Sequence, residues 1–219
     1  MRGRSALILM ALLVAVGCST GEGTPAGVAF TKVDLPAGSG VPVLLSPAKD
    51  TLLIGTRRDG QPLVPGLLRR GPDGTVADIP GQAASPYGLI ARWFSIVSDG
   101  DRIFGVGGEN GGAHGNVRWS VWNGQPSAIT EKAQAFSTFS GYGSGELTDV
   151  VLTPSGPVIL GTWQSVKAGY DLATWLPQGD DWNRQESAGT LLESSLDELG
   201  FPVSATDRKS TRLNSSHER

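Results

Sequence analysis

Three segments of this 219-residue chain repeat one pattern, and the repeat constrains the fold more than any other feature of the sequence. Each segment holds an apolar run, a turn of about four residues, and a second apolar run that contains a glycine. The repeated glycines are Gly55, Gly105 and Gly161, at intervals of about 50 to 56 residues. A third apolar run, another turn and a short fourth run follow each time. Because apolar runs bounded by turn residues are typical of strands, each segment is predicted to form four antiparallel strands.

A four-stranded unit that recurs about every 53 residues is typical of one blade of a β-propeller. The predicted blades cover residues 41–80, 91–131 and 147–186, within a domain at 41–206. We therefore expect an all-β fold, an incomplete β-propeller-like array of about three four-stranded blades. A β-sandwich is the alternative all-β fold. Since propellers close with roughly four to eight blades, three would leave the ring open, and we expect the natural sequence to continue beyond Thr206.

Composition agrees with this expectation. The chain contains 31 glycines and 14 prolines, which are common in the turns between short strands. Hydrophobic residues make up 39% of the chain, which is enough for a packed core. If the segments are equivalent, Ile54, Phe104 and Ile159 occupy the same position in the second strand of each blade and point the same way.

The N-terminus has the pattern of a secretory signal. Arg2 and Arg4 are followed by an apolar stretch at residues 6–16, which is shorter than the roughly 20 residues that a membrane-spanning helix needs. Residues 15–18 read Ala-Val-Gly-Cys, with small residues before the only cysteine of the chain. This tetrapeptide resembles the lipobox of bacterial lipoproteins, in which the cysteine is acylated and becomes the new N-terminus. The family prefers Leu at the first of the four positions.

The resemblance implies an exported protein held on the extracytoplasmic face of a cell membrane or outer membrane by acyl chains on Cys18. Residues 1–17 would be the signal peptide, and residues 18–40 would form the lipidated cysteine, a tether and a first strand. The residues that suggest this strand are Val28, Phe30 and Val33. Each buried methylene contributes about 0.8 kcal/mol, so two or more acyl chains give stable attachment. Over residues 41–190 the repeat resembles propeller-containing exported lipoproteins in general.

The C-terminal residues have a different origin. Residues 207–217 read Asp-Arg-Lys-Ser-Thr-Arg-Leu-Asn-Ser-Ser-His, a peptide encoded by consecutive codons of a common short-read sequencing adapter. We therefore interpret residues 207–219 as a translated adapter and exclude them from functional reasoning.

The charge of the domain argues against some partners. The chain has 18 basic and 21 acidic residues, of which six basic and two acidic ones lie in the two ends, so residues 18–206 carry about −7. Nucleic-acid binding needs clusters of Lys and Arg for the phosphates, and this acidic sequence has no basic cluster. We expect no nucleic-acid partner, and contact with the membrane through the lipid anchor.

No catalytic, metal or cofactor site is predicted. Outside the adapter His114 is the only histidine, and Cys18 is assigned to the lipid, so a zinc site lacks ligands. No Gly-x-Ser-x-Gly motif is present, and residues 105–108 (Gly-Val-Gly-Gly) lead into a strand and not into a helix, unlike a phosphate-binding loop. Asp99 and Asp101 lie in a predicted turn, where an aspartate commonly caps its own backbone.

Loop length indicates a binding face. The connections between the second and third strands, and those between blades, are predicted to be long and to emerge at the same end of the blades. They cover residues 57–65, 107–116, 163–170, 81–90 and 130–146. Long loops on a rigid scaffold are where binding residues concentrate. The candidate binding residues in these loops are Arg57, Arg58, Tyr87, His114, Phe139, Tyr142, Trp163, Lys167 and Tyr170.

The expected function is that of a non-enzymatic binding or interaction scaffold outside the membrane, with a glycan, a peptide or a protein as ligand. The alternative is an extracellular hydrolase or lyase whose catalytic groups lie partly in further blades. A third alternative is an assembly lipoprotein that pairs with other chains through exposed strand edges.

Overall fold

The computed structural model describes residues 31–58, 64–111, 116–167 and 169–194. The chain divides into two compact units, Met1–Asp34 and Leu35–Arg219. Within the described ranges, no helix is long and apolar enough to cross a membrane.

The first unit is described only at residues 31–34, which have no regular secondary structure. Val33 lies in this segment without regular structure, so it is not part of the strand expected around it, and its side chain is exposed. Val28 and Phe30, which suggested the same strand, lie outside the described residues, as does Cys18.

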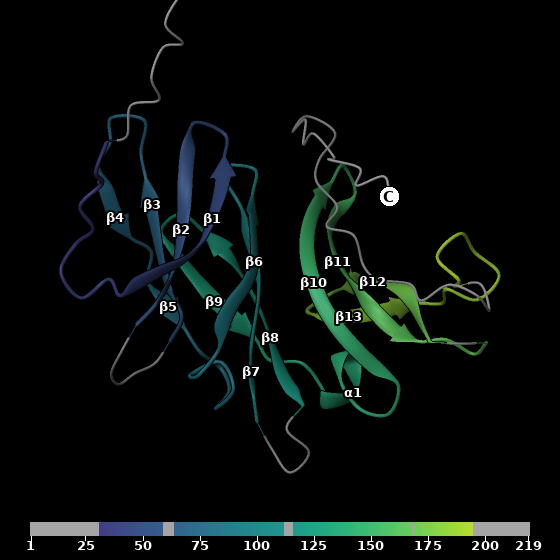
Figure 1. Cartoon of the computed structure of the whole chain (residues 1–219). Helices are drawn as coiled ribbons and strands as arrows, with labels where there is room; N and C mark the ends of the chain where they lie inside the picture. Colours follow the sequence, from purple (N-terminus) through teal and green to yellow (C-terminus); the bar gives the residue numbers. More distant parts are fainter. Residues whose placement is uncertain (1–30, 59–63, 112–115, 168, 195–219) are drawn as a thin grey trace, which may run out of the picture. The chain divides into compact units, whose positions relative to one another are not determined.

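The second unit contains three sheets, each built mainly from strands that follow one another in the sequence (Figure 1). The first sheet has the order β1-β2-β3-β4, with β1 at Val41–Ala48, β2 at Thr51–Arg57, β3 at Gly66–Arg70 and β4 at Val76–Asp78. The third sheet has the order β10-β11-β12-β13, with β10 at Ser144–Thr153, β11 at Gly156–Gln164, β12 at Tyr170–Gln178 and β13 at Asp181–Gln185. Both sheets are antiparallel throughout.

The middle sheet has five strands in the order β5-β9-β8-β7-β6. Its members are β5 at Gly81–Gln82, β6 at Arg92–Ser98, β7 at Ile103–Asn110, β8 at Val117–Gln125 and β9 at Ala128–Lys132. The short β5 comes from the connection that follows the first sheet, and it pairs in parallel with β9. One helical turn, α1 at Phe136–Phe139, precedes the third sheet.

The predicted all-β class is confirmed, and the three sheets fall close to the predicted segments. The prediction of four strands in each segment is correct for the first and third sheets and misses β5 in the middle one. These two residues, Gly81 and Gln82, lie in a stretch that was assigned to a loop. A Gly-Gln pair is too short to show the alternation of apolar and polar residues that predicts a strand.

The turns use the local chemistry that the sequence predicted. Asp99 accepts hydrogen bonds from the backbone N–H of Asp101 at 3.1 Å and of Arg102 at 2.8 Å, which closes the β6–β7 turn. These bonds, with the bonds from the Arg102 guanidinium, lower the pKa of the Asp99 carboxyl to about 2. In the β1–β2 turn, Thr51 donates its hydroxyl to the Ala48 carbonyl at 2.8 Å.

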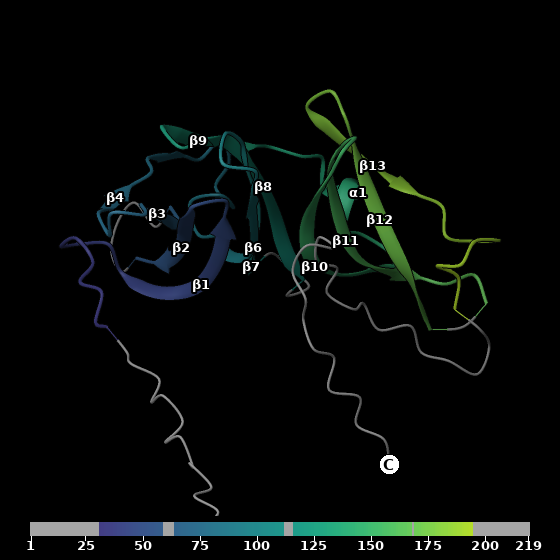
Figure 2. The ribbon, with the colours of Figure 1, turned by 90° about the horizontal axis from the view of Figure 1, so that it is seen from above.

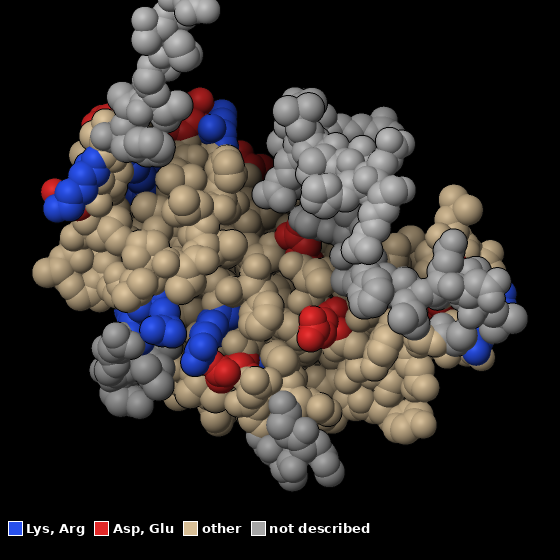
Figure 3. Space-filling view, in the orientation of Figure 1, with Lys and Arg blue, Asp and Glu red and all other residues tan. Residues whose placement is uncertain are grey.

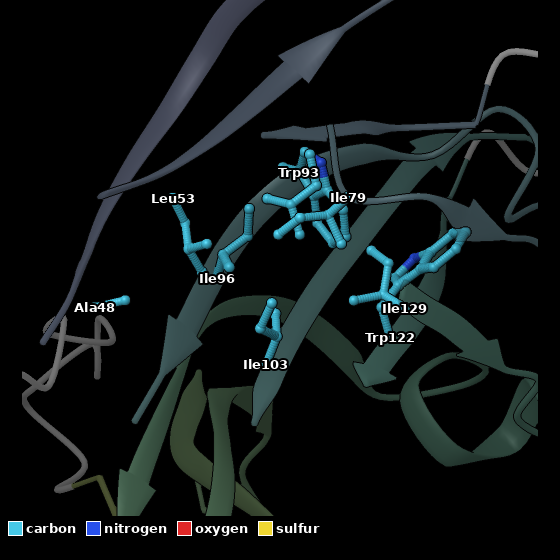
Figure 4. Close-up of a cluster of buried hydrophobic side chains, with 9 residues drawn as sticks. Ala48, Leu53, Ile79, Trp93, Ile96, Ile103, Trp122 and Ile129 are labelled. Atoms are coloured by element: carbon cyan, nitrogen blue, oxygen red, sulfur yellow. The ribbon is translucent and has the colours of Figure 1, made fainter. Parts of the chain in front are cut away.

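A first hydrophobic layer lies between the first and middle sheets (Figure 4). Its buried members are Ala48, Leu53, Leu67, Ile79, Trp93, Ile96, Ile103, Trp122 and Ile129. The rings of Trp93 and Trp122 meet edge to face with centroids 5.7 Å apart, and the Trp93 indole donates to the Gly66 carbonyl at 2.7 Å. Each such buried aromatic side chain contributes roughly 1.5–3 kcal/mol relative to an exposed one.

Two of the repeated glycines are explained by Trp93. A Cβ added at Gly105 would lie 2.5 Å from the Trp93 ring, and one added at Gly55 would lie 2.8 Å from it. Both glycines therefore leave space for one indole, Gly55 from the first sheet and Gly105 from the middle sheet. Since Gly55 and Gly105 face each other across one layer, they do not occupy equivalent positions in their sheets.

A second hydrophobic layer lies between the middle and third sheets. Its buried members are Val106, Val121, Phe139, Leu147, Val150, Ile159, Ala173, Trp175 and Trp182. Phe104 packs against this layer, while its neighbour Ile103 belongs to the first layer. Successive residues of a strand therefore face different sheets, as period-2 alternation requires.

The predicted equivalence of Ile54, Phe104 and Ile159 is wrong for Phe104. Leu53 faces the middle sheet, so Ile54 points to the opposite side of the first sheet. Ile159 points back towards the middle sheet, whereas Phe104 points forward to the third sheet. Four residues lie between Ser98 and Ile103, the last paired residues of the β6–β7 hairpin, whereas two lie between the last paired residues of the other two hairpins. An alignment of the segments on their glycines therefore shifts the register of the middle segment by one residue.

The edge strand β6 of the middle sheet contacts both β1 and β10. Figure 2 shows β1, β6 and β10 close together, with β4, β9 and β13 away from them. Ser95 in β6 donates its hydroxyl to the Asp149 carboxylate in β10, and its oxygen accepts the Val150 N–H at 3.1 Å. β6 and β10 are therefore joined by polar contacts as well as by hydrophobic ones.

Candidate ligand-binding face

The strands that border the predicted loops are longer than expected. β7 continues to Asn110 and β8 begins at Val117, so the connection predicted at 107–116 shrinks to residues 111–116. Gly107 and Gly108, which were assigned to the predicted loop at 107–116, pair with Ser120 and Trp119 in the β7–β8 ladder. A Cβ at Gly108 would lie 2.7 Å from the Val117 side chain, so this glycine serves close packing rather than a turn.

The same shortening occurs in the third sheet, where the predicted loop at 163–170 becomes residues 165–169. Figure 1 shows α1 at the lower end of the sheets, the end at which β7 stops and β8 starts. This end, the loop end, carries the side chains that we consider as a binding face.

The nine predicted binding residues are placed differently by the structure. Tyr87, Tyr142 and Tyr170 are exposed, with exposed fractions of 42%, 96% and 44%, and Arg57 is exposed as well. His114 lies outside the described residues. The other four predicted residues are held by neighbours in the protein.

Phe139 does not line a binding face, and its prediction as a binding residue is corrected by its burial. Its side chain is 3% exposed and belongs to the second hydrophobic layer, with its ring centroid 5.7 Å from that of Trp175. Trp163 is half-buried against the same layer, 6.3 Å from Trp175, and the Arg184 guanidinium lies 4.8 Å from its ring centroid. Both aromatic side chains contribute to packing between sheets.

Two of the predicted cations form ion pairs. Arg58 pairs with Asp78 in β4, next to the start of β3. Lys167 lies 3.0 Å from Glu193, and its hydrogen bond lowers the pKa of the Glu193 carboxyl, together with the Gly189 backbone N–H. Surface pairs of this kind stabilise a protein weakly, and their cations are already matched to a carboxylate.

A cluster that the sequence analysis missed lies at the loop end of the middle sheet. The guanidinium carbon of Arg118, in β8, lies 4.3 Å from the ring centroid of Phe136 and 5.7 Å from that of Tyr87. Phe136 and Tyr87 are 51% and 42% exposed. We call these three side chains the Arg118 cluster. Cation–π contacts at such exposed positions contribute about 0.5–1 kcal/mol each.

The loop that carries Tyr87 is held by a buried carboxylate. Glu131 in β9 is 3% exposed and accepts the backbone N–H groups of Ala84 at 2.7 Å and Ser85 at 2.8 Å. It also accepts the Ser85 hydroxyl at 2.6 Å. A Cβ at Gly88 would lie 2.0 Å from the same carboxylate, so the loop closes tightly around it. Glu131 therefore fixes the position of Tyr87 from behind.

Phe136 is held in a similar way from the other side of the cluster. It begins α1, whose last residue is the buried Phe139. The Trp175 indole donates to the Thr138 carbonyl at 2.8 Å, and the Ser140 hydroxyl donates to the Val117 carbonyl at 3.3 Å. Hydrogen bonds thus join the helical turn to both the middle and the third sheets. The backbone that carries the exposed Phe136 ring is therefore held in place.

The cation of the cluster lacks acceptors at two buried nitrogens, whereas Arg58 and Arg70 each have one such nitrogen and, among the described residues, no pair of exposed rings beside it. Glu109, the cross-strand neighbour of Arg118, forms its ion pair with Arg92 at 2.5 Å. Within the described ranges Arg118 has no ion pair, and its Nε and Nη1 atoms are buried without a hydrogen-bond partner. A buried donor without an acceptor costs about 1–3 kcal/mol. The cluster therefore combines a cation that lacks an acceptor with two exposed aromatic rings.

Two other kinds of site to consider among the described residues are a basic surface and a metal site. On the described part of the face in Figure 3, charged side chains lie in small separate groups, and no extended basic area is visible. Among the described residues, no group of three or more His, Cys, Asp or Glu side chains could hold a metal ion.

Sequence reasoning missed Arg118 because it lies in a strand that alternates polar and apolar residues, where a polar side chain is ordinarily a solvated one. Phe136 offered a usable signal, since it is an aromatic residue in the long predicted loop at 130–146. The chain matches no protein-family model and no curated protein.

Proposed function

We propose that this chain is an extracytoplasmic lipoprotein, anchored through Cys18, whose β-propeller-like domain binds a ligand at the loop end of its middle sheet. The observation that carries the binding role is the Arg118 cluster, in which two exposed rings flank a guanidinium that has no acidic partner among the described residues. The backbone segments that carry both rings are held by hydrogen bonds, so little ordering of the backbone is needed when a ligand binds.

Three observations support the β-propeller-like arrangement. The edge strands β1, β6 and β10 of the three sheets lie next to one another, since β6 contacts both β1 and β10. Successive sheets stack face to face through hydrophobic layers, as blades do. Val41, Val43 and Leu45 in β1 are 52%, 48% and 62% exposed, and a further sheet packed on this side would bury them.

The anchor is tested by the substitution Cys18→Ala in the full chain, expressed in a bacterium. We expect the protein to move from the membrane fraction to the soluble extracytoplasmic fraction, because the acyl chains would be absent. Export itself should remain, since the apolar signal at residues 6–16 is unchanged. A Cys18→Ala protein that still fractionates entirely with the membrane would show that another element attaches it.

The binding role is tested with the same Cys18→Ala form of the full chain on a panel of immobilised saccharides and peptides. We expect at least one of them to bind, and Tyr87→Ser to weaken that binding about threefold to tenfold because it removes one ring of the cluster. Tyr142→Ser is the matched control, since Tyr142 is 96% exposed and forms no ring contact with Arg118. Loss of binding with Tyr142→Ser alone would move the site elsewhere on the loop end.

A further inference from the structure

We infer that the Arg118 cluster binds a saccharide that carries carboxylate groups, such as a uronic acid. This inference rests on the proposed binding function and adds the class of ligand. It follows from three features of the cluster, namely the missing acceptor, the two exposed rings and their fixed spacing around one cation.

The missing acceptor determines the charged group of the ligand. A guanidinium presents parallel N–H donors that match the two oxygens of a carboxylate, and such charge-assisted pairs are stronger than neutral hydrogen bonds. Arg118 has two nitrogens, Nε and Nη1, without an acceptor, while its acidic neighbour Glu109 is engaged by Arg92. A ligand carboxylate that reaches these nitrogens supplies the acceptors that the protein does not. Because both nitrogens are buried beside the Phe136 ring, a carboxylate reaches them only when that half-exposed ring rotates about its own side-chain bonds, while the backbone that carries it stays in place.

The two rings determine the body of the ligand. Tyr87 and Phe136 flank the guanidinium, and each has a large part of its surface open to solvent. Exposed aromatic rings pack against the C–H face of a sugar by dispersion and burial of apolar surface. A uronic acid has a carboxylate fixed beside such a face in the same ring. An acidic peptide carries its carboxylate on a flexible side chain without an apolar face at a fixed place, so it fits the cluster less well.

The support of the cluster favours a ligand that is recognised without large rearrangement. Glu131 fixes the Tyr87 loop, and the Trp175 and Ser140 hydrogen bonds fix the segment that carries Phe136. Backbone segments held in this way lose little conformational freedom on binding, so a modest contact area gives a measurable affinity.

The test uses calorimetric titration of the full Cys18→Ala chain with an oligogalacturonate and with a neutral oligosaccharide of the same length. We expect the oligogalacturonate to bind at least about tenfold more tightly, and Arg118→Gln to abolish that difference, because the charge-assisted pair is lost. Arg118→Lys should keep only part of the difference, since an ammonium lacks the planar fork. Arg102→Gln, at the opposite end of the same sheet, is the matched control and should bind like the parent chain.

Circular dichroism of each variant shows whether its sheets are retained, and Arg118→Lys keeps the test decisive if Arg118→Gln does not fold. Equal binding of the neutral and acidic saccharides would overturn the carboxylate inference and leave the proposed binding function in place. Tighter binding of an oligoglutamate peptide than of the oligogalacturonate would overturn the saccharide class. If the panel described above yields a ligand but the oligogalacturonate does not bind, the inference alone fails; if nothing binds in either experiment, the proposed function fails with it.

Discussion

The two ends of the middle sheet use arginine in opposite ways. At the turn end, Arg102 donates from Nε at 2.9 Å and from Nη2 at 2.8 Å to one carboxylate oxygen of Asp99, whose other oxygen accepts two backbone N–H groups. At the loop end, Arg118 is flanked by two aromatic rings and has two nitrogens without an acceptor. The first arginine is satisfied by its own turn, and the second has binding capacity that the described part of the protein does not use. The contrast separates a side chain that stabilises the fold from one that is available to a ligand.

The largest expected change in stability comes from removing the carboxylate that holds the Tyr87 loop at the loop end. Glu131→Ala removes a buried carboxylate and leaves the Ala84 and Ser85 N–H groups without their acceptor, so the free energy of unfolding should fall by about 2–4 kcal/mol. Urea denaturation measures this loss. Glu109→Ala is the control, because its partner Arg92 is exposed and the change should stay below about 1 kcal/mol. Equal losses for the two variants would mean that Glu131 does not hold the loop.

A smaller effect sharpens the comparison between the two arginines. Arg102→Gln should lower the free energy of unfolding by about 0.5–1 kcal/mol, because it removes the partner of Asp99 in an exposed turn. Arg118→Gln should change it by less than about 0.5 kcal/mol, since the lost contacts with the rings are offset by relief of the unpaired donors. Thermal and urea denaturation of the two variants side by side give the answer. A greater loss with Arg118→Gln would make this residue mainly structural.

The smallest expected effect is the pH dependence at the turn end. Hydrogen bonds from the Arg102 backbone and side chain lower the pKa of Asp99 to about 2 in the folded protein, from 3.8. A carboxyl with a lowered folded pKa contributes stability above its unfolded pKa, and this stability is lost as the pH falls from about 4 to about 2. Because Asp99 is partly exposed, the contribution should be below about 1 kcal/mol after screening. Asp99→Asn should be less stable than the parent chain at pH 7 and should lose less stability over that interval; parallel curves for the two proteins would contradict the assignment.

Several features of the fold were predictable because they depend on neighbours in the sequence. The Asp99 turn follows from an aspartate that caps the N–H groups two and three residues later. The strands of the three sheets follow from short apolar runs between turn residues, and their two-sided burial follows from alternation along each strand. These interactions are short in range, so the pattern of residues is sufficient to predict them.

Other features were decided only where distant parts of the chain meet. Gly55 and Gly105 look equivalent in the repeat, but the structure places them on opposite sides of Trp93, because a turn of different length shifts the register. Arg118 looks like an ordinary strand residue until Tyr87 and Phe136 are brought to it from two separate connections. The sequence by itself determined the all-β class and the turn chemistry, since these rest on local hydrogen bonds and on alternation. Tertiary structure decided register and the candidate site, since both depend on which side chains approach each other across sheets.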